Sequence, residues 1–284
     1  MTMPDRDPRQ WLGEIIQDYI DTSPINHIGN GTGERAWTDS LVGFANGADP
    51  IFREYKQHVG EFHWTPREIF NDTFPDQAAA DEELTVISYI LPQTEATKVD
   101  HRQEIKRPSE RWARTRIFGE KFNEALQQHL VGQLAEAGIQ ALAPTLTPGW
   151  KTSLSPKYVF ASYWSHRHAA YAAGLGTFGL CDGLITPKGK AMRVGSVVAR
   201  IPIPSTPRPY DQHRAYCLFF SNGTCKECVD RCPVGALSEN GHDKIKCRKF
   251  LGVTAKYVEK NFGFKGYGCG LCQIGVPCES GIPE

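Results

Sequence analysis

Apolar residues recur at helical spacing in three stretches of the chain. Residues 8–22 place them on one face of a helix, and an aspartate–proline pair just ahead suits the N-cap and first turn. Residues 111–138 repeat them mostly four apart and end at Gly138, a residue typical of a helix stop. Residues 161–173 are rich in alanine. We therefore predict three helices at these positions.

Two apolar runs and one alternating stretch predict strands. Residues 84–91 are continuously apolar and β-rich, and residues 139–146 form a second candidate strand. With helix 111–138 between them, they predict a βαβ unit in an α/β layer. Residues 183–203 alternate around a basic turn at 188–190, which predicts a β-hairpin.

A proline-rich connector is expected to divide the chain. Residues 201–210 contain four prolines and precede most of the cysteines. We predict an α/β (α+β) domain over residues 1–205 and a cysteine-rich domain over residues 206–284.

Composition and charge exclude little. The 284 residues are 40% hydrophobic and 23% charged, as in an ordinary globular protein. The formal net charge of +0 gives no global electrostatic argument for nucleic acid, and no apolar run approaches the ~20 residues of a membrane span. The polar N-terminus has no twin arginine. A reducing cytoplasm, which keeps thiols available as ligands, is the expected location, and no membrane partner is expected. Nucleic acid is not an expected partner, although a local basic patch for it is not excluded.

The chemistry gathers in the last quarter of the chain, where eight of the nine cysteines lie. One run reads Cys225-x2-Cys228-x3-Cys232-Pro233, and a second begins at Cys269. Two-cluster ferredoxins use such runs, and the cysteine before proline ligates the other cluster. We therefore predict two [4Fe–4S] clusters. The first would take Cys217, Cys225, Cys228 and Cys278, and the second Cys247, Cys269, Cys272 and Cys232.

The runs depart from the regular ferredoxin pattern at two positions. Asn222 and Val276 stand where a regular run has cysteine, so Cys217 and Cys278 must act as displaced ligands of the first cluster. Four-thiolate zinc sites are the alternative, although their paired knuckles usually lie closer together. A disulfide scaffold is typical of small secreted chains and fits less well. Cys181 is left over, either as a reactive thiol near a cofactor or as a buried free cysteine.

A glycine turn follows the third predicted helix. Gly174, Gly176 and Gly179 spell a dinucleotide-binding fingerprint, but that motif must follow a strand and open a helix. Here it follows a helix, which excludes a Rossmann site. The glycines still predict a close approach of backbone to another element or to a flat ligand.

The order of these parts resembles one superfamily. The glycine turn, then residues 183–187 (GLITP), then the cysteine module, is similar to the epoxyqueuosine reductases and reductive dehalogenases over roughly residues 84–284. That resemblance implies a nitroreductase-like α/β core that holds a base-off cobalamin, with a ferredoxin-like module that feeds electrons to cobalt. It also implies that the cofactor is approached by Gly174, Gly176, Gly179, Thr186 and Arg193.

The resemblance also implies a proton donor. Epoxyqueuosine reductases use an aspartate ahead of this helix, but residues 152–163 contain no Asp or Glu. Dehalogenases are expected to use a tyrosine with a basic neighbour, a role open to Tyr163 with Arg167 one helical turn on; packing of Tyr163 in the core is the alternative. The export signal of membrane-associated dehalogenases and the helical-repeat tail of many epoxyqueuosine reductases are not recognised.

These observations lead to one expected function and two alternatives. We expect a corrinoid-dependent reductase, an oxidoreductase that acts on a small-molecule substrate and receives electrons from an external donor of ferredoxin or flavodoxin type. The alternatives are a corrinoid-free electron-transfer protein of ferredoxin type and a structural zinc protein.

Overall fold

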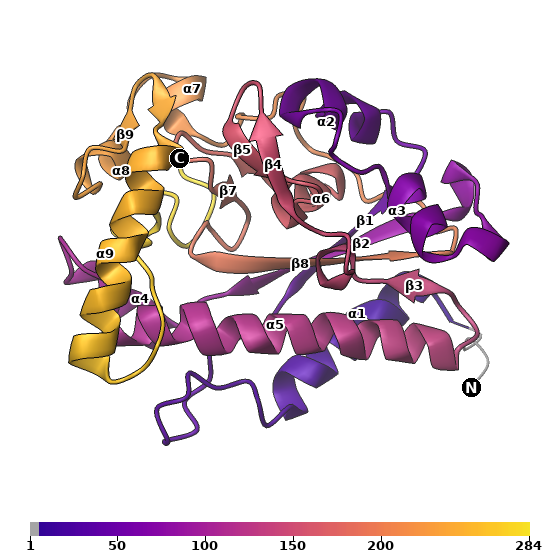
Figure 1. Ribbon diagram of the computed structural model, residues 1–284, viewed down its shortest axis with the longest axis horizontal. Helices are drawn as coiled ribbons and strands as arrows, with labels where there is room; N and C mark the ends of the chain where they lie inside the picture. The colour runs from indigo at the N-terminus through magenta and orange to yellow at the C-terminus, as the bar shows by residue number, and fades with distance from the viewer. Residues whose placement is uncertain (1–5) are drawn as a thin grey trace.

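A four-stranded sheet lies at the centre of the computed structural model, which describes residues 6–284 (Figure 1). The strand order is β1-β2-β8-β3 and all neighbours pair antiparallel. Their bounds are Leu41–Asn46 for β1, Thr85–Pro92 for β2, Met192–Ala199 for β8 and Ala141–Leu142 for β3. The fold is thus a mixed α/β fold.

Helices cover both faces of this sheet (Figure 1). On one face lie α1 (Pro8–Thr22) and α5 (Glu110–Glu136), and on the other α2 (Ile51–Val59), α3 (Pro66–Thr73) and α6 (His166–Ala172). Strand β2 is buried along its whole length because successive side chains point to opposite layers. Ile87 and Tyr89 pack with α1 and α5, whereas Val86 and Ile90 pack with the second layer.

The two longest helices of the α/β layer begin and end within two residues of their predicted bounds. The Asp7 carboxylate accepts a hydrogen bond from the backbone N–H of Arg9 and caps α1. Ser109 caps α5 in the same way through Trp112. Gly138, with φ of 77°, follows the end of α5 in the left-handed conformation.

The remaining elements are short, apart from one helix at the C-terminal end. Strands β4 (Thr152–Ser155) and β5 (Val159–Ser162) form a hairpin, and β6 (Thr177–Phe178) pairs with β7 (Leu184–Ile185). Helix α4 (Glu95–Arg102) precedes α5. The cysteine-rich part contains α7 (Leu218–Ser221), α8 (Glu227–Asp230), β9 (Leu237–Ser238), β10 (Gly241–His242) and α9 (Lys244–Phe262). The 3-10 helices are η1 (Pro75–Gln77), η2 (Asp81–Glu83), η3 (Pro144–Leu146) and η4 (Leu271–Gln273).

Four sequence expectations need correction. The hairpin predicted for residues 183–203 is wrong, because β7 pairs with β6 while β8 enters the central sheet between β2 and β3. Strands β2 and β3 are therefore not neighbours as in a simple βαβ unit. The strand predicted for 139–146 is only two residues long, since a proline follows it. The helix predicted from residue 161 starts at His166, because β5 occupies residues 159–162.

The connector at 201–210 is attached to the edge of the sheet. Thr206 exchanges hydrogen bonds with the backbone of Phe44 in β1, and the Ser205 hydroxyl accepts one from Asn46. Ile201 and Ile203 are buried in the α1–α5 layer. Residues 206–284 are therefore reached through a packed segment, which fixes their path relative to β1. Across residues 6–284, no helix is both long and apolar enough to span a membrane.

Two glycine-to-alanine substitutions should change the free energy of unfolding in opposite directions. A Cβ at Gly195 would overlap the Tyr89 ring across β2 and β8, so Gly195→Ala should lower the free energy of unfolding by about 1–3 kcal/mol. Gly132 provides the control, because it is exposed inside α5 and an added methyl group there would meet open space. Gly132→Ala should raise that free energy by roughly 0.5–1 kcal/mol. Urea unfolding measures both, and a neutral Gly195→Ala would contradict this packing.

Candidate functional site

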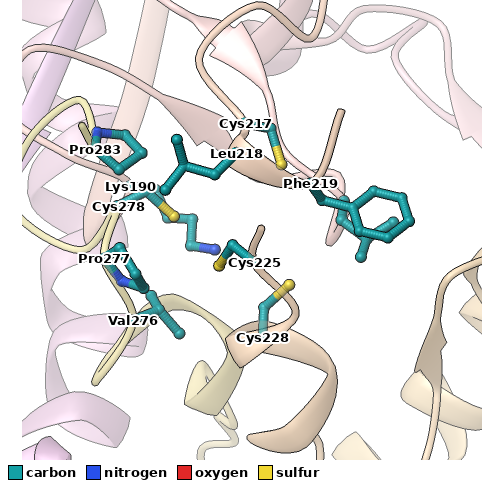
Figure 2. A pocket seen from close by; sticks show the side chains of 11 residues that line it. Lys190, Cys217, Leu218, Phe219, Cys225, Cys228, Val276, Pro277, Cys278 and Pro283 are labelled. Carbon is teal, nitrogen blue, oxygen red and sulfur yellow. The ribbon is translucent and has the colours of Figure 1, made fainter. Parts of the chain in front are cut away.

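Four cysteines line the first of two cavities in the C-terminal part of the chain. Cys217 precedes α7, Cys225 precedes α8, Cys228 lies within α8, and Cys278 comes from the C-terminal loop. Figure 2 shows their side chains around a shared space. We call this cavity the first cysteine pocket. Separate elements thus deliver four thiols to one place.

The other four cysteines of the module line a second, larger cavity of about 260 Å³. Cys232 follows α8, Cys247 lies in the first turn of α9, Cys269 precedes η4 and Cys272 lies within it. We call this cavity the second cysteine pocket. Its opposite wall is formed by the first turns of α5 and the start of β8.

The two pockets divide the eight cysteines in the same way as the sets predicted from spacing. The displaced residues Cys217 and Cys278 both reach the first pocket. All nine cysteines are free thiols, and within residues 6–284 no three His, Cys, Asp or Glu side chains could hold a single metal ion. The assignment of the eight thiols as cluster ligands stays a prediction.

The thiols are held in surroundings that favour the protonated form. Burial raises the pKa of Cys278, and burial raises the pKa of Cys269 to about 11. Because the thiolate is the metal ligand, binding at these positions must release protons. The backbone N–H of Ala236 donates to the Cys232 sulfur over 3.2 Å, a contact that would stabilise its thiolate.

Cys181, the ninth cysteine, lies between the two pockets. Hydrogen bonds with the thiols of Cys228 and Cys272, one from each set, hold the pKa of Cys181 well below its usual range. Lys190 donates from Nζ to the Cys181 sulfur over 3.4 Å. Cys181 lines the second pocket and Lys190 the first. Together they occupy the wall that the two pockets share.

The burial of Lys190 differs from the sequence expectation, which placed it in a basic turn. Only Lys188 of that turn is exposed, where it forms an ion pair with Asp39. The side chain of Lys190 is turned inward, and the residue is only 2% exposed. No local sequence signal separates the two lysines, because the difference arises when the C-terminal loop covers residue 190.

Cationic side chains line the second pocket. They are Arg116, Arg167, Arg193 and His242, and its described lining includes no Asp or Glu. The Asp182 carboxylate, together with the Cys247 thiol, raises the pKa of His242 to about 9. Arg193 forms an ion pair with Glu120, which also pairs with Arg116. The pocket is therefore suited to negatively charged contents.

Two contacts from α4 hold the C-terminal cysteine loop. His101 is fully buried, stacks on Trp112 with 4.5 Å between ring centroids, and bonds through Nε2 to the Cys269 carbonyl over 2.8 Å. Its Nδ1 accepts from the Ser109 N–H, so Nε2 carries the proton. Burial lowers the pKa of His101 to about 3. The neutral ring thus fixes the position of Cys269.

The second contact joins Arg102 to Glu279. The guanidinium donates from Nε to Oε1 over 3.0 Å, and Glu279 also accepts from the N–H of Gly275. Glu279 follows Cys278 directly. This ion pair therefore holds the loop that carries a first-pocket cysteine.

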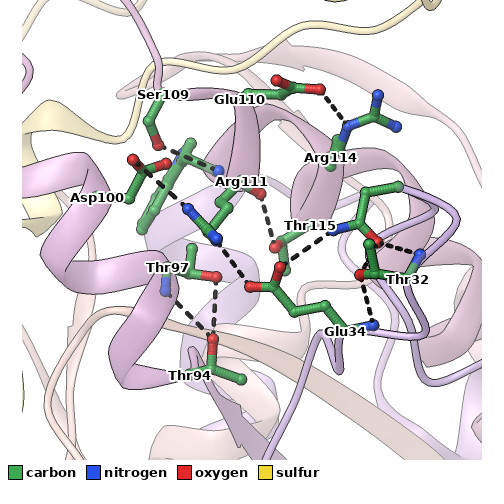
Figure 3. Close-up of polar contacts among 12 residues, drawn as sticks. Thr32, Glu34, Thr94, Thr97, Asp100, Ser109, Glu110, Arg111, Arg114 and Thr115 are labelled. Carbon is green, nitrogen blue, oxygen red and sulfur yellow. Dashed lines mark hydrogen bonds and ion pairs between the residues drawn. The ribbon is translucent and has the colours of Figure 1, made fainter.

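A polar network fixes the start of α5, which faces the second pocket (Figure 3). Arg111 pairs with Glu34 over 2.7 Å and with Asp100 over 3.8 Å, which ties α5 to the N-terminal loop and to α4. With the Ser109 cap, these contacts set the orientation of Trp112 in the pocket wall.

The three glycines that the resemblance implies for cofactor binding lie against other parts of the protein. A Cβ at Gly174 would meet the Pro207 carbonyl, and one at Gly176 the Ile185 carbonyl, so both glycines allow close approach of the protein's own backbone. A Cβ at Gly179 would meet the Ile185 side chain at 3.3 Å.

Thr186 is fully buried and its hydroxyl donates to the carbonyl of Gly189. Arg193 alone among the five residues lines one of the two cysteine pockets. The structure therefore does not gather all five around one described cavity.

Tyr163 and Arg167 are not arranged as expected. Tyr163 precedes α6 instead of lying on it, and it packs against Phe62 and Trp64 with Lys151 over its ring. Arg167 donates to the carbonyl of Asp182 and lines the second pocket. The basic neighbour of Tyr163 is thus Lys151, because the helix begins three residues beyond Tyr163.

Comparison with known proteins gives partial matches. An epoxyqueuosine reductase of Staphylococcus aureus is 37% identical over 124 residues, and that of Bacillus anthracis is 32% identical over the same length. Each match covers 42% of this chain and 30% of the relative. Over that stretch the chain is similar to the epoxyqueuosine reductases. The family resemblance found in the sequence is confirmed, although the chain spans only about a third of the length of these curated relatives. No protein-family model matches the chain.

Solved structures show a looser likeness. Epoxyqueuosine reductase from Bacillus subtilis superposes with a TM-score of 0.48 at 16% identity, over 97% of this chain and 67% of that one. A catabolic reductive dehalogenase gives 0.49 at 17% identity, over 86% of this chain and 30% of that one. Scores below 0.5 carry no argument about function.

The buried His101 predicts a pH dependence of stability. Its pKa is about 3 in the folded protein and 6.5 ordinarily, so the unfolded chain binds the proton more readily below pH 6.5. Stability contributed by neutral His101 is complete above pH 6.5 and is lost as pH falls toward 3. His101→Gln should flatten the decline between pH 7 and 5 by up to about 1.4 kcal/mol per pH unit. Anaerobic urea unfolding at three pH values measures this, and parallel declines in both proteins would contradict it.

Proposed function

We propose that the chain is an iron–sulfur redox protein in which each cysteine pocket holds one [4Fe–4S] cluster. The observation that carries the proposal is the agreement between two independent divisions of the eight cysteines. One division comes from ligand spacing and the other from the cavities that the side chains line. If the ligand sets from spacing were wrong, their members would not be expected to line the same two cavities in groups of four.

The donor sets fit such clusters. The first pocket offers four cysteine sulfurs and the second offers its four predicted ligands besides Cys181, with no carboxylate among the described lining of either pocket. When bound, the clusters supply one-electron transfer. The chain's own residues position the thiols through the His101 and Glu279 contacts, donate a hydrogen bond to the Cys232 sulfur, and provide positive charge nearby.

The same proposal extends to activity. We infer a reductase that acts on a small-molecule substrate and takes electrons from an external ferredoxin-type or flavodoxin-type donor, in the cytoplasm. In this proposal, residues up to about 205 form a nitroreductase-like core and residues from about 206 a ferredoxin-like module. The relatedness to proteins named as reductases supports the activity, and the cysteine pockets support the redox class.

A cobalamin is the less supported part of the proposal. Of the five residues implied for its binding, Arg193 faces a described pocket, whereas Gly176 and Thr186 contact the protein's own backbone. The residues present do not fit the cofactor as the resemblance implies, and we assign no step to it. This observation favours a second candidate function, a corrinoid-free electron-transfer protein.

Cluster content tests the first part. Anaerobically purified protein should contain iron and acid-labile sulfide for two clusters, and Cys225→Ser or Cys247→Ser should each lose about half of both. Cys181→Ser, which changes a thiol outside both sets, is the matched control and should keep both clusters. Zinc in place of iron, or full iron in both ligand variants, would refute the assignment.

Cobalamin titration tests the second part. A saturable shift of the cluster-loaded protein towards the base-off absorption spectrum would support a corrinoid reductase. Arg193→Met should then weaken binding several-fold, because Arg193 lines the second pocket, whereas Arg200→Met, just beyond the far end of β8, should not. With both clusters intact, the absence of a shift would leave the electron-transfer protein as the function.

A further inference from the structure

Lys190 is a buried cation fixed between the two cysteine pockets. Only 2% of the residue is exposed, and its backbone N–H donates to the carbonyls of Cys278 and Glu279 over 2.9 and 3.1 Å. Its position is therefore set by the C-terminal loop, the same segment that delivers Cys278 to the first pocket. Figure 2 shows the Lys190 ammonium among the sulfurs of that pocket.

Lys190 has no carboxylate partner among residues 6–284. None of the ion pairs within that range includes it, whereas Lys188, two residues earlier, pairs with Asp39. Its hydrogen-bond acceptor is the Cys181 sulfur, at 3.4 Å. An ammonium taken out of water is strongly unfavourable unless a negative charge or strong acceptors compensate it.

The groups that surround this ammonium are thiols. Lys190 lines the first pocket together with Cys217, Cys225, Cys228 and Cys278. It reaches the second pocket only through Cys181, whose sulfur accepts its hydrogen bond and which lines that pocket. Deprotonated sulfur in the cysteine pockets is therefore the compensating charge that this part of the structure offers.

We propose that Lys190 is the counter-charge that tunes the first-pocket cluster. The inference rests on the proposed function, because it requires a cluster in that pocket. A cluster gains one negative charge when it accepts an electron, and a fixed ammonium beside its ligands stabilises the reduced form more than the oxidised form. Lys190 therefore raises the reduction potential of the first-pocket cluster, and that of the second-pocket cluster less.

The test compares three lysine variants in cluster-loaded protein. Lys190→Met removes the charge and keeps most of the side-chain length, Lys190→Arg keeps the charge, and Lys188→Met removes an exposed charge two residues away. Redox titration followed by electron paramagnetic resonance gives the two midpoint potentials of each protein. Iron and sulfide content of the unaltered protein is measured first, since an unaltered protein without clusters refutes the proposed function itself.

The expected result is a shift of both potentials to more negative values in Lys190→Met, larger for the first-pocket cluster, whose signal is the one that Cys225→Ser abolishes. Lys190→Arg should remain closer to the unaltered protein, and Lys188→Met should match it. Unchanged potentials in Lys190→Met would overturn the inference. If Lys190→Met loses a cluster while Lys190→Arg retains it, the positive charge at residue 190 is what holds that cluster. Equal loss in both variants would show that Lys190 acts by packing alone and would also overturn it.

Discussion

The cysteine-rich part of this chain has little hydrophobic core of its own, and this constraint governs the rest of the structure. The buried cluster around the first pocket combines four cysteines with four aliphatic side chains, and two of these, Leu180 and Ile185, come from the chain before residue 206. A segment that buries so little apolar surface cannot hold eight thiols in place by itself. Contacts from the α/β layer must fix it, and His101 and Arg102 provide two of them.

Different positive groups balance the negative charge of the sulfurs in the two pockets. Both collect cysteines that are buried or partly buried, where uncompensated negative charge is costly. The first pocket has a buried ammonium, Lys190, and the second has arginines and His242 along its wall. Arg116 and Arg193 share the Glu120 carboxylate, so part of their charge is already balanced within the protein. The net field at each pocket is set by few residues.

Local sequence patterns predict those features whose contacts lie between residues close together in the sequence. The N-cap of α1, the end of α5 just before Gly138 and the buried strand β2 follow from spacing and residue type. The location of β8 did not, because its partners β2 and β3 are distant in the sequence. Lys190 illustrates the same limit at a single residue. Its difference from Lys188 depends on a loop about ninety residues later, which no local pattern describes.

The insertion of β8 between β2 and β3 also determines the order in which the chain can assemble. A ribosome releases β2, α5 and β3 well before residues 192–199, so for that interval the edges of β2 and β3 that will bind β8 remain unpaired. Closing this gap requires contacts between residues far apart in sequence, which makes folding slow and leaves exposed edges open to wrong pairing. The thiols emerge after β8 and meet a sheet that can already be complete. If the pockets hold the proposed clusters, cluster insertion is a late event, and defects in the sheet would be observed first as protein that lacks iron.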